Sequence, residues 1–368
     1  MWYTPTNSNR AVIPLMTNSI TQPQHEQPDH AFLATVPPAN GPGRVLVTGA
    51  TGFAGSAMLR ACVGRGYTVR ALVRDADKAK SLEASGVEVA IGNMKDTGSL
   101  TRALRDVSVV YHFASIFRQI GLPPEEFRSV NVEGPSRLII AASESGVGRV
   151  VHISTVGVHG DVEHPPATEM SPFRPGDIYQ RTKLEGEQQA VATAARLKVP
   201  LTVVRPAPMY GPGDRRMLKL FAGVAHRRFP ILGSGDALFS MVHIDDLVEG
   251  VRLAGESPFA VGRTFIIGSD EYMSLNALVS LVAQEAGVEP LGFHLPVWPF
   301  WLAGAICEGV CAPFGIEPPL YRRRVAFFTK SRAFDITRAR TELGYSPKVS
   351  LREGVRSTLH WYREAGWL

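Results

Sequence analysis

Short apolar runs alternate with helical patterns along most of this 368-residue chain, and this alternation restricts the fold more than any other feature. The runs are continuous stretches rich in Val, Ile and Leu, and they lie at 44–48, 67–73, 87–92, 106–114, 148–155, 200–206 and 263–268. Continuous apolar strands joined by helices are typical of a parallel sheet that is covered on both faces. The chain is therefore predicted to be an α/β protein with a doubly wound parallel sheet.

A glycine-rich turn, VTGATGFAGSAM, follows the first predicted strand and opens a helix. The turn contains Gly49, Thr51, Gly52, Phe53, Ala54 and Gly55. Glycine permits a tight turn and a close backbone approach, and a helix N-terminus offers N–H groups and a positive dipole end to phosphate. A plain tight turn with small-residue packing is the alternative. In this strand–turn–helix context, the motif favours a Rossmann-type domain that binds a dinucleotide.

The end of the second strand bears on the choice between NAD and NADP. An acidic side chain there would bind the ribose hydroxyls of NAD, but Val73 holds the expected acidic position and Arg74 follows it. A guanidinium can pair with a 2′-phosphate through charge and bidentate geometry. Asp75 comes one residue late and is expected to start the next turn. We therefore favour NADP over NAD, and an exposed strand-end cation is the alternative interpretation of Arg74.

The next two strands end in residues that suit the rest of a dinucleotide. The third ends in IGNMKD, where Asn93 is expected to bond to the adenine amino group and Met94 to pack against the ring. The fourth ends in HFAS, where Phe113, Ala114 and Ser115 are expected to run beneath the pyrophosphate and ribose. Since open parallel sheets bind ligands at the carboxyl ends of their strands, these positions extend the predicted cofactor site.

The fifth strand and the helix after it carry the candidate reacting groups. Ser154 and Thr155 lie at the carboxyl end of the strand, in HISTVGVHG. Tyr179 and Lys183 are four residues apart in IYQRTKLEG, so a helix would place them on one face. A Tyr-x-x-x-Lys spacing is common by chance. The phosphate-binding turn and the Ser-Thr pair before it are what make this one a candidate catalytic pair.

The chain resembles the extended short-chain dehydrogenases/reductases of the NAD-dependent epimerase/dehydratase family. The motifs TGATGFAG, HISTVGVHG, YQRTK, VVRPAPMYGPGD and VHIDDLVEG occur in the order typical of that family, over about residues 44 to 368. The segments FDITRARTELGY and WYREAGWL are most similar to its 3β-hydroxysteroid dehydrogenase-like and dihydroflavonol-reductase-like branch. The resemblance implies an NAD(P)-dependent enzyme, and a homodimer with the helices of the Asn131 and Tyr179 regions at its interface.

The resemblance also implies roles for residues that match the family motifs. Tyr179 would exchange a proton with the oxygen of the reacting C–O bond. A free Tyr has a pKa of about 10, and a neighbouring cation lowers this pKa by stabilising the phenolate. Lys183 would be that cation, and it would also bond to the nicotinamide ribose. Thr155 would bond to the substrate oxygen and position it, and Ser154 would replace it if the register differed by one.

Other positions have a structural and a functional interpretation. Pro206 and Met209 belong to a loop that, by the resemblance, would hold the nicotinamide carboxamide. Asn131 is expected to tie the central strands together, and a place along the cofactor is the alternative. In the VHIDD segment, Asp245 is expected to cap a helix that starts near Leu247 rather than to take part in catalysis.

The predicted strands divide the chain into domains. Residues 1–43 are rich in Pro, Asn, Gln and Thr and are expected to form a disordered or loosely packed extension. The dinucleotide-binding Rossmann domain is predicted at 44–206 and is completed by about 243–268. The remaining segments, 207–242 and 269–368, carry more Pro, aromatics and loops. They are expected to form a smaller substrate domain with the C-terminal helices.

One apolar segment, VWPFWLAGAICEGVCAPFGI at 297–316, raises the question of a membrane. Glu308 lies in its middle, and Pro299 and Pro313 lie near its ends, so the uninterrupted apolar run is too short to span a bilayer. We expect a buried helix or an apolar lid. A helix on a membrane surface is the alternative.

Composition and charge argue against several other classes of function. The net charge is +5, but the basic residues are dispersed, so no nucleic-acid site is predicted, and the trio at 322–324 is interpreted as solvated or anion-facing. Cys62, Cys307 and Cys311 have neither disulfide-framework nor metal-ligand spacing, so no metal is predicted. The first residues lack the pattern of a secretory signal, and with this cysteine usage we expect a cytoplasmic protein.

Three functions remain. The first is hydride transfer between the cofactor and a secondary alcohol or ketone of a fairly apolar substrate, sterol- or flavonoid-like; Arg74 and the apolar 297–316 segment favour it. The second is a nucleotide-sugar epimerase or dehydratase that recycles NAD internally. Such relatives usually have an Arg before the VHIDD-type segment, which GSGDALFSMVHIDD lacks, although Lys219 and Arg227 are available for phosphate. The third is a non-catalytic NADP-binding regulator, against which the retained Thr-Tyr-Lys set argues.

Overall fold

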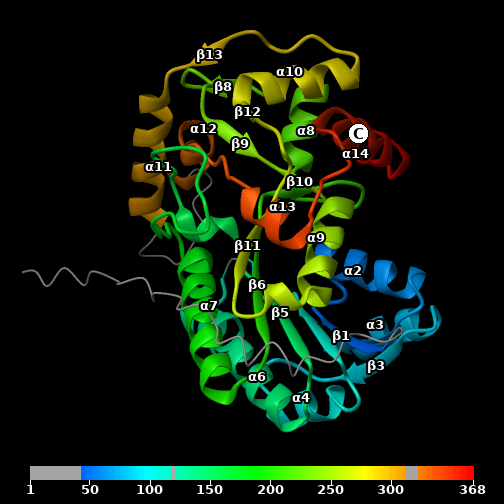
Figure 1. Cartoon of the computed structure of the whole chain (residues 1–368). Helices are drawn as coiled ribbons and strands as arrows, with labels where there is room; N and C mark the ends of the chain where they lie inside the picture. Colours follow the sequence, from blue (N-terminus) through cyan, green and yellow to red (C-terminus); the bar gives the residue numbers. More distant parts are fainter. Residues whose placement is uncertain (1–42, 118, 120, 312–321) are drawn as a thin grey trace, which may run out of the picture.

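The computed structural model describes residues 43–117, 119, 121–311 and 322–368 (Figure 1). The predicted N-terminal extension lies outside the described residues except for Gly43, and so do residues 312–316 of the long apolar segment. Within the described ranges, no group of three or more His, Cys, Asp or Glu side chains is placed to hold a metal ion. Among the helices of these ranges, none is long and apolar enough to cross a membrane.

Seven parallel strands form the central sheet, in the order β11-β6-β5-β4-β1-β2-β3. The strands are β1 (Arg44–Thr48), β2 (Thr68–Val73), β3 (Glu88–Ile91), β4 (Val109–His112), β5 (Arg149–Ile153), β6 (Leu201–Pro206) and β11 (Thr264–Ile267). Each apolar run of the sequence forms one of them, so the predicted fold class is confirmed. The strand order reverses between β1 and β4, and open parallel sheets bind ligands beyond the carboxyl ends of the strands at this point.

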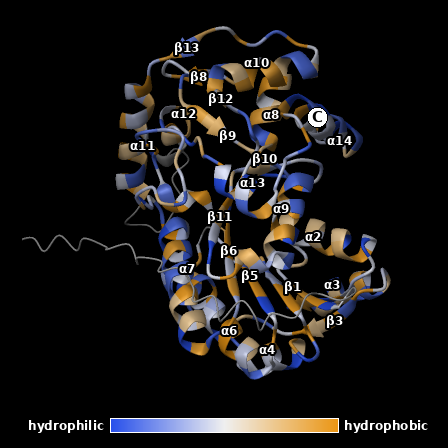
Figure 2. Ribbon diagram, viewed as in Figure 1, coloured by the Kyte–Doolittle hydropathy of each residue, from blue (hydrophilic) through white to orange (hydrophobic). Residues whose placement is uncertain are grey.

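Helices cover both faces of the sheet, which is why its strands are apolar on both sides (Figure 1). Along β1, Val45 and Val47 enter one core and Leu46 enters the other, since successive strand side chains point to opposite faces. Many of the hydrophobic segments in Figure 2 lie on these strands. One face carries α2 (Phe53–Gly64), α3 (Ala76–Glu83), α9 (Ile244–Glu256) and α13 (Thr337–Leu343). The other carries α4 (Thr97–Ala103), α6 (Gly134–Glu144) and α7 (Ile178–Leu197).

A third hydrophobic core lies beyond the carboxyl ends of the strands, in the upper part of Figure 1. None of its described residues belongs to the seven-stranded sheet. The elements of this region are α8 (Leu218–Ala225), α10 (Leu275–Ala286), α11 (Val297–Cys311), α12 (Arg322–Thr329), α14 (Leu351–Glu364) and the strand pairs β8–β13 (Ile231–Leu232, His294–Leu295) and β9–β12 (Leu238–Ser240, Tyr272–Ser274). The predicted domain boundaries stay a prediction.

Short elements connect these layers. Helix α5 (Pro124–Arg128) and a π-helical turn (Ser129–Glu133) lead into α6, and 3-10 turns occur at Val156–His159 and Pro258–Ala260. The strands β7 (Met209–Tyr210) and β10 (Val242–His243) form a parallel pair after β6. Helix α14 is the amphipathic terminal helix that the sequence predicts, and it begins with a capping box between Ser350 and Glu353.

The predicted start of the VHIDD helix is wrong. Helix α9 begins at Ile244, and His243 is its N-cap, with a ring nitrogen that accepts a bond from the backbone N–H of Asp245 at 3.4 Å. Asp245 therefore lies inside the first turn, where a negative charge is favoured by the helix dipole. The carboxylate of Asp246 accepts bonds from the N–H groups of Lys348 at 2.8 Å and Val349 at 3.1 Å. This segment joins α9 to the chain that precedes α14.

The predicted burial of the apolar helix is also wrong for the part that is described. In α11, Trp298, Trp301, Leu302, Ile306 and Val310 are exposed. The sequence correctly predicts a largely apolar helix here, but apolar composition alone does not determine whether other elements cover it.

Candidate active site

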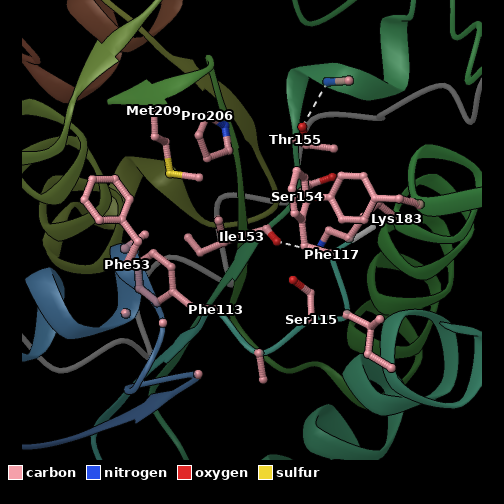
Figure 3. Close-up of a pocket in the computed structure, with 18 of the residues that line it drawn as sticks. Phe53, Phe113, Ser115, Phe117, Ile153, Ser154, Thr155, Lys183, Pro206 and Met209 are labelled. Carbon is pink, nitrogen blue, oxygen red and sulfur yellow. Dashed lines mark hydrogen bonds between the residues drawn. The ribbon is translucent and has the colours of Figure 1, made fainter. Parts of the chain in front are cut away.

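A cavity of about 1000 Å³ lies at the carboxyl ends of the central strands, next to the third core (Figure 3). Every residue that the sequence predicts for the cofactor or the reaction lines this cavity, from Gly49 to Met209. In Figure 3, Phe53 and Phe113 lie on one side of it, and Thr155 and Lys183 lie on the other. The fold therefore brings these positions together, while the role of each remains a prediction.

The glycine turn lies close to the backbone of the segment after β4. Gly49 has a φ of +69°, which L side chains rarely adopt, and a Cβ there would lie 2.8 Å from the backbone nitrogen of Ala114. A Cβ at Gly55 would overlap the carbonyl oxygen of Gly49. The described first turn of α2 contains no acidic residue, so its N–H groups and dipole remain available to a phosphate. These residues fit the pyrophosphate of a dinucleotide.

A smaller hollow of about 280 Å³ continues from the turn past the end of β2. It is lined by Thr51, Val73, Arg74, Asp75 and Lys78. The Asp75 carboxylate caps α3 and accepts a bond from the N–H of Asp77 at 2.9 Å, as expected for a residue that starts the next turn. The hollow thus combines two cationic side chains with one carboxylate that is already engaged.

The residues after β3 and β4 form the floor of the cavity. The Asn93 side-chain oxygen accepts a bond from the N–H of Lys95 at 2.8 Å, which fixes the turn after β3. Met94 lines the cavity but is only 4% exposed and packs into the core on the α4 side. Phe113, Ala114 and Ser115 all line the cavity after β4. The part of the cavity that is predicted to hold adenine therefore has one polar and one apolar side chain, Asn93 and Met94.

Asn131 ties the loop after β4 to the helix that bears Tyr179. Its side-chain oxygen accepts from the N–H of Ile116 at 2.8 Å, and its amide donates to the carbonyl oxygen of Ile116 at 3.0 Å. It also donates to the hydroxyl of Thr182 at 3.2 Å. Asn131 is 1% exposed, and these bonds join a loop to a helix rather than the central strands to one another, so its contacts are structural but differ from the predicted ones.

Thr155 and Ser154 differ in their access to the cavity. Thr155 is half-buried, and its hydroxyl oxygen accepts a bond from the N–H of Gly157 at 3.0 Å, so it caps the 3-10 turn. That bond uses a lone pair and leaves the hydroxyl hydrogen for another acceptor. Ser154 is 4% exposed. Of the two hydroxyls, the one on Thr155 is better placed for a substrate oxygen.

Tyr179 and Lys183 begin α7, which Asp177 caps by accepting from the N–H of Gln180 at 2.8 Å. Tyr179 is half-buried, and its ring meets the ring of Phe117 edge-on, with centres 4.9 Å apart. Lys183 is 3% exposed, and its Nζ donates to the carbonyl oxygen of Ile153 at 2.6 Å (Figure 3). Burial of the ammonium lowers the pKa of Lys183 to about 8.

A buried ion pair supports this helix one turn further on. Glu187 and Arg205 are nearly inaccessible, and their side chains meet at 2.5 Å between Oε1 and Nη2. Burial would raise the pKa of the Glu187 carboxyl, but the Arg205 guanidinium outweighs this and holds it below its usual value. Arg205 also donates to the carbonyl oxygen of Glu169 at 2.9 Å. The pair fixes α7 to β6 and places a negative charge near Lys183.

The half of the cavity beyond Tyr179 has an aromatic wall that the sequence does not reveal. Its apolar side chains are Phe117, Met217, Phe239, Met241, Phe327 and Phe334. They come from separate loops and short elements, so no local spacing marks them. The wall suits the predicted apolar substrate.

Two arginines also line the cavity, and neither was predicted. Arg216 lies with its guanidinium 5.1 Å from the centre of the Phe53 ring and donates to Asp214 at 2.7 Å. Asp214 in turn accepts a bond at its backbone oxygen from the Tyr362 hydroxyl at 2.7 Å. Arg332 lies 5.8 Å from the centre of the Phe239 ring. Lys219 and Arg227, the candidates from the sequence, are not among the described residues that line the cavity.

Comparison with known proteins identifies the family. The model of the NAD dependent epimerase/dehydratase family matches residues 45–268, which include the glycine turn, β5 and all of α7. The chain belongs to this family. The match confirms the resemblance to extended short-chain dehydrogenases/reductases, whose members are NAD(P)-dependent oxidoreductases, epimerases and dehydratases.

Relatives of known name fall in the branch that the sequence indicates. The chain is 29% identical to sterol demethylase protein B of Methylococcus capsulatus over 88% of this chain and 99% of the relative. It is 26% identical to a putative dihydroflavonol 4-reductase of Synechocystis over 88% and 95%. It is also 26% identical to 3beta-hydroxysteroid-dehydrogenase/decarboxylase isoform 2 of Arabidopsis thaliana over 85% and 61%.

A solved structure with the same fold contains a dinucleotide. The crystal structure of DesIV, a dTDP-glucose 4,6-dehydratase from Streptomyces venezuelae with NAD and TYD bound, is 26% identical to the chain. The TM-score is 0.71, and the match covers 88% of this chain and 98% of that one. The likeness supports the fold class and shows that a structural neighbour binds NAD.

Proposed function

We propose that the protein is an NADP-favouring oxidoreductase that transfers a hydride between the cofactor and a secondary alcohol or ketone of an apolar substrate. The observation that carries the proposal is one cavity with the Thr155, Tyr179 and Lys183 side chains beside the glycine turn and an aromatic wall beyond them. When bound, the nicotinamide would supply or accept the hydride, which side chains cannot do.

The side chains around the cavity would control the proton and the orientation of the substrate. The Thr155 hydroxyl would donate to the substrate oxygen and hold it. During reduction, the Tyr179 hydroxyl would give its proton to that oxygen; during oxidation, the Tyr179 phenolate would receive the proton of the alcohol. The ammonium of Lys183 would stabilise the phenolate that forms, and Glu187 would keep that charge on Lys183, since its carboxylate opposes the loss of the proton.

The charge around the hollow at β2 supports the preference for NADP. Arg74 and Lys78 both line it, and a 2′-phosphate between them would meet two cations. Replacement of Arg74 by Asp should raise the KM for NADPH by roughly 10- to 100-fold, the loss of about 1.5–3 kcal/mol for a charged hydrogen bond. Arg60→Asp, an exposed change on α2, is the matched control. A wild-type protein that binds NAD as well as NADP would refute the preference.

The wall of the cavity and the names of relatives support an apolar substrate. Phe239, Phe327 and Phe334 would pack against hydrocarbon or ring systems, since large apolar surfaces bind by burial. Relatives named for sterols, a hydroxysteroid and a dihydroflavonol agree with a sterol- or flavonoid-like class.

A nucleotide-sugar epimerase or dehydratase with internally recycled NAD is the alternative. The specific observation in its favour is that Arg216 and Arg332 both line the cavity, where two guanidinium groups would suit a diphosphate. The match to DesIV, which holds a nucleotide, agrees with it. Net consumption of NADPH with ketone substrates supports the oxidoreductase. The alternative is supported if a nucleotide sugar is converted while the absorbance of the reduced cofactor shows no net change.

The decisive experiment on the mechanism is Tyr179→Phe. We expect kcat to fall by roughly 100- to 10,000-fold while dinucleotide affinity is kept, because only the proton-transfer group is removed. Tyr272→Phe, at a half-exposed tyrosine on β12 that does not line the cavity, is the control and should have wild-type activity. Comparable turnover in Tyr179→Phe would remove Tyr179 from the mechanism.

We also propose a homodimer and a cytoplasmic location. The dimer would use α7 and the helical segment around Asn131, as the family resemblance implies. Light scattering on the purified protein tests the oligomeric state, and fractionation of cells tests the location.

A further inference from the structure

The loop between β7 and α8 brings a guanidinium to the glycine turn. The guanidinium carbon of Arg216 lies 5.1 Å from the centre of the Phe53 ring, and both side chains line the cavity. In the same loop, Gly213 has a φ of +92°, and a Cβ there would lie 3.8 Å from two carbon atoms of the Phe53 ring. The loop therefore lies against the residue that begins α2.

Two hydrogen bonds orient this guanidinium. Nε of Arg216 donates to the Asp214 carboxylate at 2.7 Å, and Nη2 donates to the carbonyl oxygen of Met209 at 3.2 Å. Phe53 and Met209 lie on this side of the cavity in Figure 3. A guanidinium has five N–H donors in a planar fork. Among the described residues, Nη1 of Arg216 has no hydrogen-bond partner, so its N–H groups are available to a ligand in the cavity.

Asp214 fixes Arg216 from inside the protein. Asp214 is fully buried, and its carboxylate also accepts bonds from the backbone N–H groups of Arg216 at 3.2 Å and Met217 at 3.0 Å. Its backbone oxygen accepts a bond from the Tyr362 hydroxyl on α14 at 2.7 Å. Because Asp214 is held by these contacts, the guanidinium is oriented before a ligand binds, which lowers the entropic cost of binding.

The place of Arg216 beside the glycine turn suits a phosphate ligand. The N-terminus of α2, which Phe53 begins, offers N–H groups to phosphate, and a guanidinium forms charge-assisted bonds to phosphate oxygens. Two other cations of the cavity are engaged elsewhere. Lys95 pairs with Glu126 at 2.6 Å, and the buried Lys183 donates to a backbone carbonyl.

We propose that Arg216 binds the pyrophosphate of the dinucleotide together with the glycine turn, and that Asp214 and Tyr362 position its guanidinium. The inference rests on the proposed use of a dinucleotide, and it adds to that site a residue from outside the central sheet and its covering helices. The dinucleotide would then contact both the sheet and the region of the third core. A diphosphate of the substrate is the other ligand that Arg216 would suit, and its contact with Phe53 favours the pyrophosphate.

The test compares two ligands that differ by one phosphoryl group, and it needs no turnover. AMP and ADP, or their 2′-phosphorylated forms if the wild type prefers NADP, are titrated calorimetrically into the wild type and Arg216→Gln. We expect the wild type to bind ADP more tightly than AMP, and Arg216→Gln to lose roughly ten-fold or more of this preference. A folding defect would weaken the binding of both ligands alike, whereas loss of a pyrophosphate contact weakens the binding of ADP.

Arg215→Gln is the matched control. The Arg215 guanidinium lies 4.7 Å from the centre of the Trp367 ring, and Arg215 is not among the described residues that line the cavity. This variant should bind both ligands as the wild type does. An unchanged ADP preference in Arg216→Gln would overturn the proposal. A substrate KM that rises while the dinucleotide Kd stays constant would assign Arg216 to the substrate instead. A wild type that binds no dinucleotide would refute the proposed function itself.

Tyr362→Phe tests the positioning role. It removes the hydroxyl that bonds to Asp214 and keeps the aromatic ring in the third core. We expect the ADP preference to fall roughly two- to five-fold in the wild-type background and to stay unchanged in the Arg216→Gln background, because the hydroxyl acts through the guanidinium. An equal fall in both backgrounds would refute the role of Tyr362 in positioning Arg216.

Discussion

Lys183→Met should make the cofactor-free protein more stable at neutral pH, although it removes a residue of the proposed mechanism. Lys183 is 3% exposed, and burial of its charge lowers its pKa from the usual 10.5 to about 8. At pH 7 the wild type therefore keeps a proton on a buried ammonium, which costs folding free energy. Methionine has a similar length without the charge and should remove this cost.

The magnitude follows from the pKa. The difference between a pKa of 10.5 and one of about 8 corresponds to about 3.5 kcal/mol, at about 1.4 kcal/mol for each tenfold change in the acid dissociation constant. Methionine leaves the carbonyl oxygen of Ile153 without the Nζ donor at 2.6 Å, which costs about 1 kcal/mol. The net gain at pH 7 is about 2.5 kcal/mol. It declines as the pH rises from about 8 to about 10.5, because the folded protein no longer holds the proton but the unfolded chain does.

Calorimetric unfolding of the apo proteins at pH 7 and at pH 10.5 measures the difference. We expect the variant to unfold roughly 3 °C above the wild type at pH 7 and at or below it at pH 10.5. Lys219→Met, at an exposed lysine, is the control and should show no such dependence on pH. A Lys183→Met protein that is less stable than the wild type at pH 7 would refute the reasoning.

Two further predictions concern the fold around the site. Gly55→Ala should abolish dinucleotide binding and lower the unfolding temperature, because its Cβ would overlap the Gly49 carbonyl oxygen; Gly64→Ala, on the same helix with open space around it, should bind normally. A fluorescence titration with dinucleotide measures binding, and a thermal scan measures the unfolding temperature. Normal binding by Gly55→Ala would contradict the proposal that the glycine turn holds the pyrophosphate. Asp246→Ala should lose about 2–3 kcal/mol of unfolding free energy in denaturant titrations, because two backbone N–H groups before α14 lose their charged acceptor. The Asp245 side chain is 78% exposed, so the unfolding free energy of Asp245→Ala should stay within about 0.5 kcal/mol of the wild-type value. Equal losses in the two variants would contradict the conclusion that Asp246, and not Asp245, holds the segment before α14.

The sheet could be predicted from the sequence because each strand is a local signal. In β5, all five residues of the run RVVHI are buried. Such a strand can be recognised from its own residues, without knowing which strands lie beside it. The side of the cavity that contains the glycine turn is predictable for the same reason. Its residues follow directly after strands, and parallel strands end at one edge of the sheet.

The parts that could not be predicted depend on contacts between distant segments. The aromatic wall combines Phe117 after β4, Phe239 on β9 and Phe327 on α12, and only the tertiary fold brings them together. The start of α9 depends on His243, whose ring caps the helix in place of a more common Asp or Ser. The exposure of α11 depends on which elements pack against it. An apolar run is equally consistent with burial in a core and with contact to another apolar phase.

The bond between Tyr362 and Asp214 has a consequence for the order in which the protein is made. The glycine turn and the strands around it lie early in the chain, so a ribosome would release them while α14 is still unmade. Asp214 holds Arg216 over Phe53, and Tyr362 on α14 holds Asp214. The nascent protein would thus form its glycine turn before α14 fixes the opposite side of the cavity. The cavity would be complete only after α14 has left the ribosome.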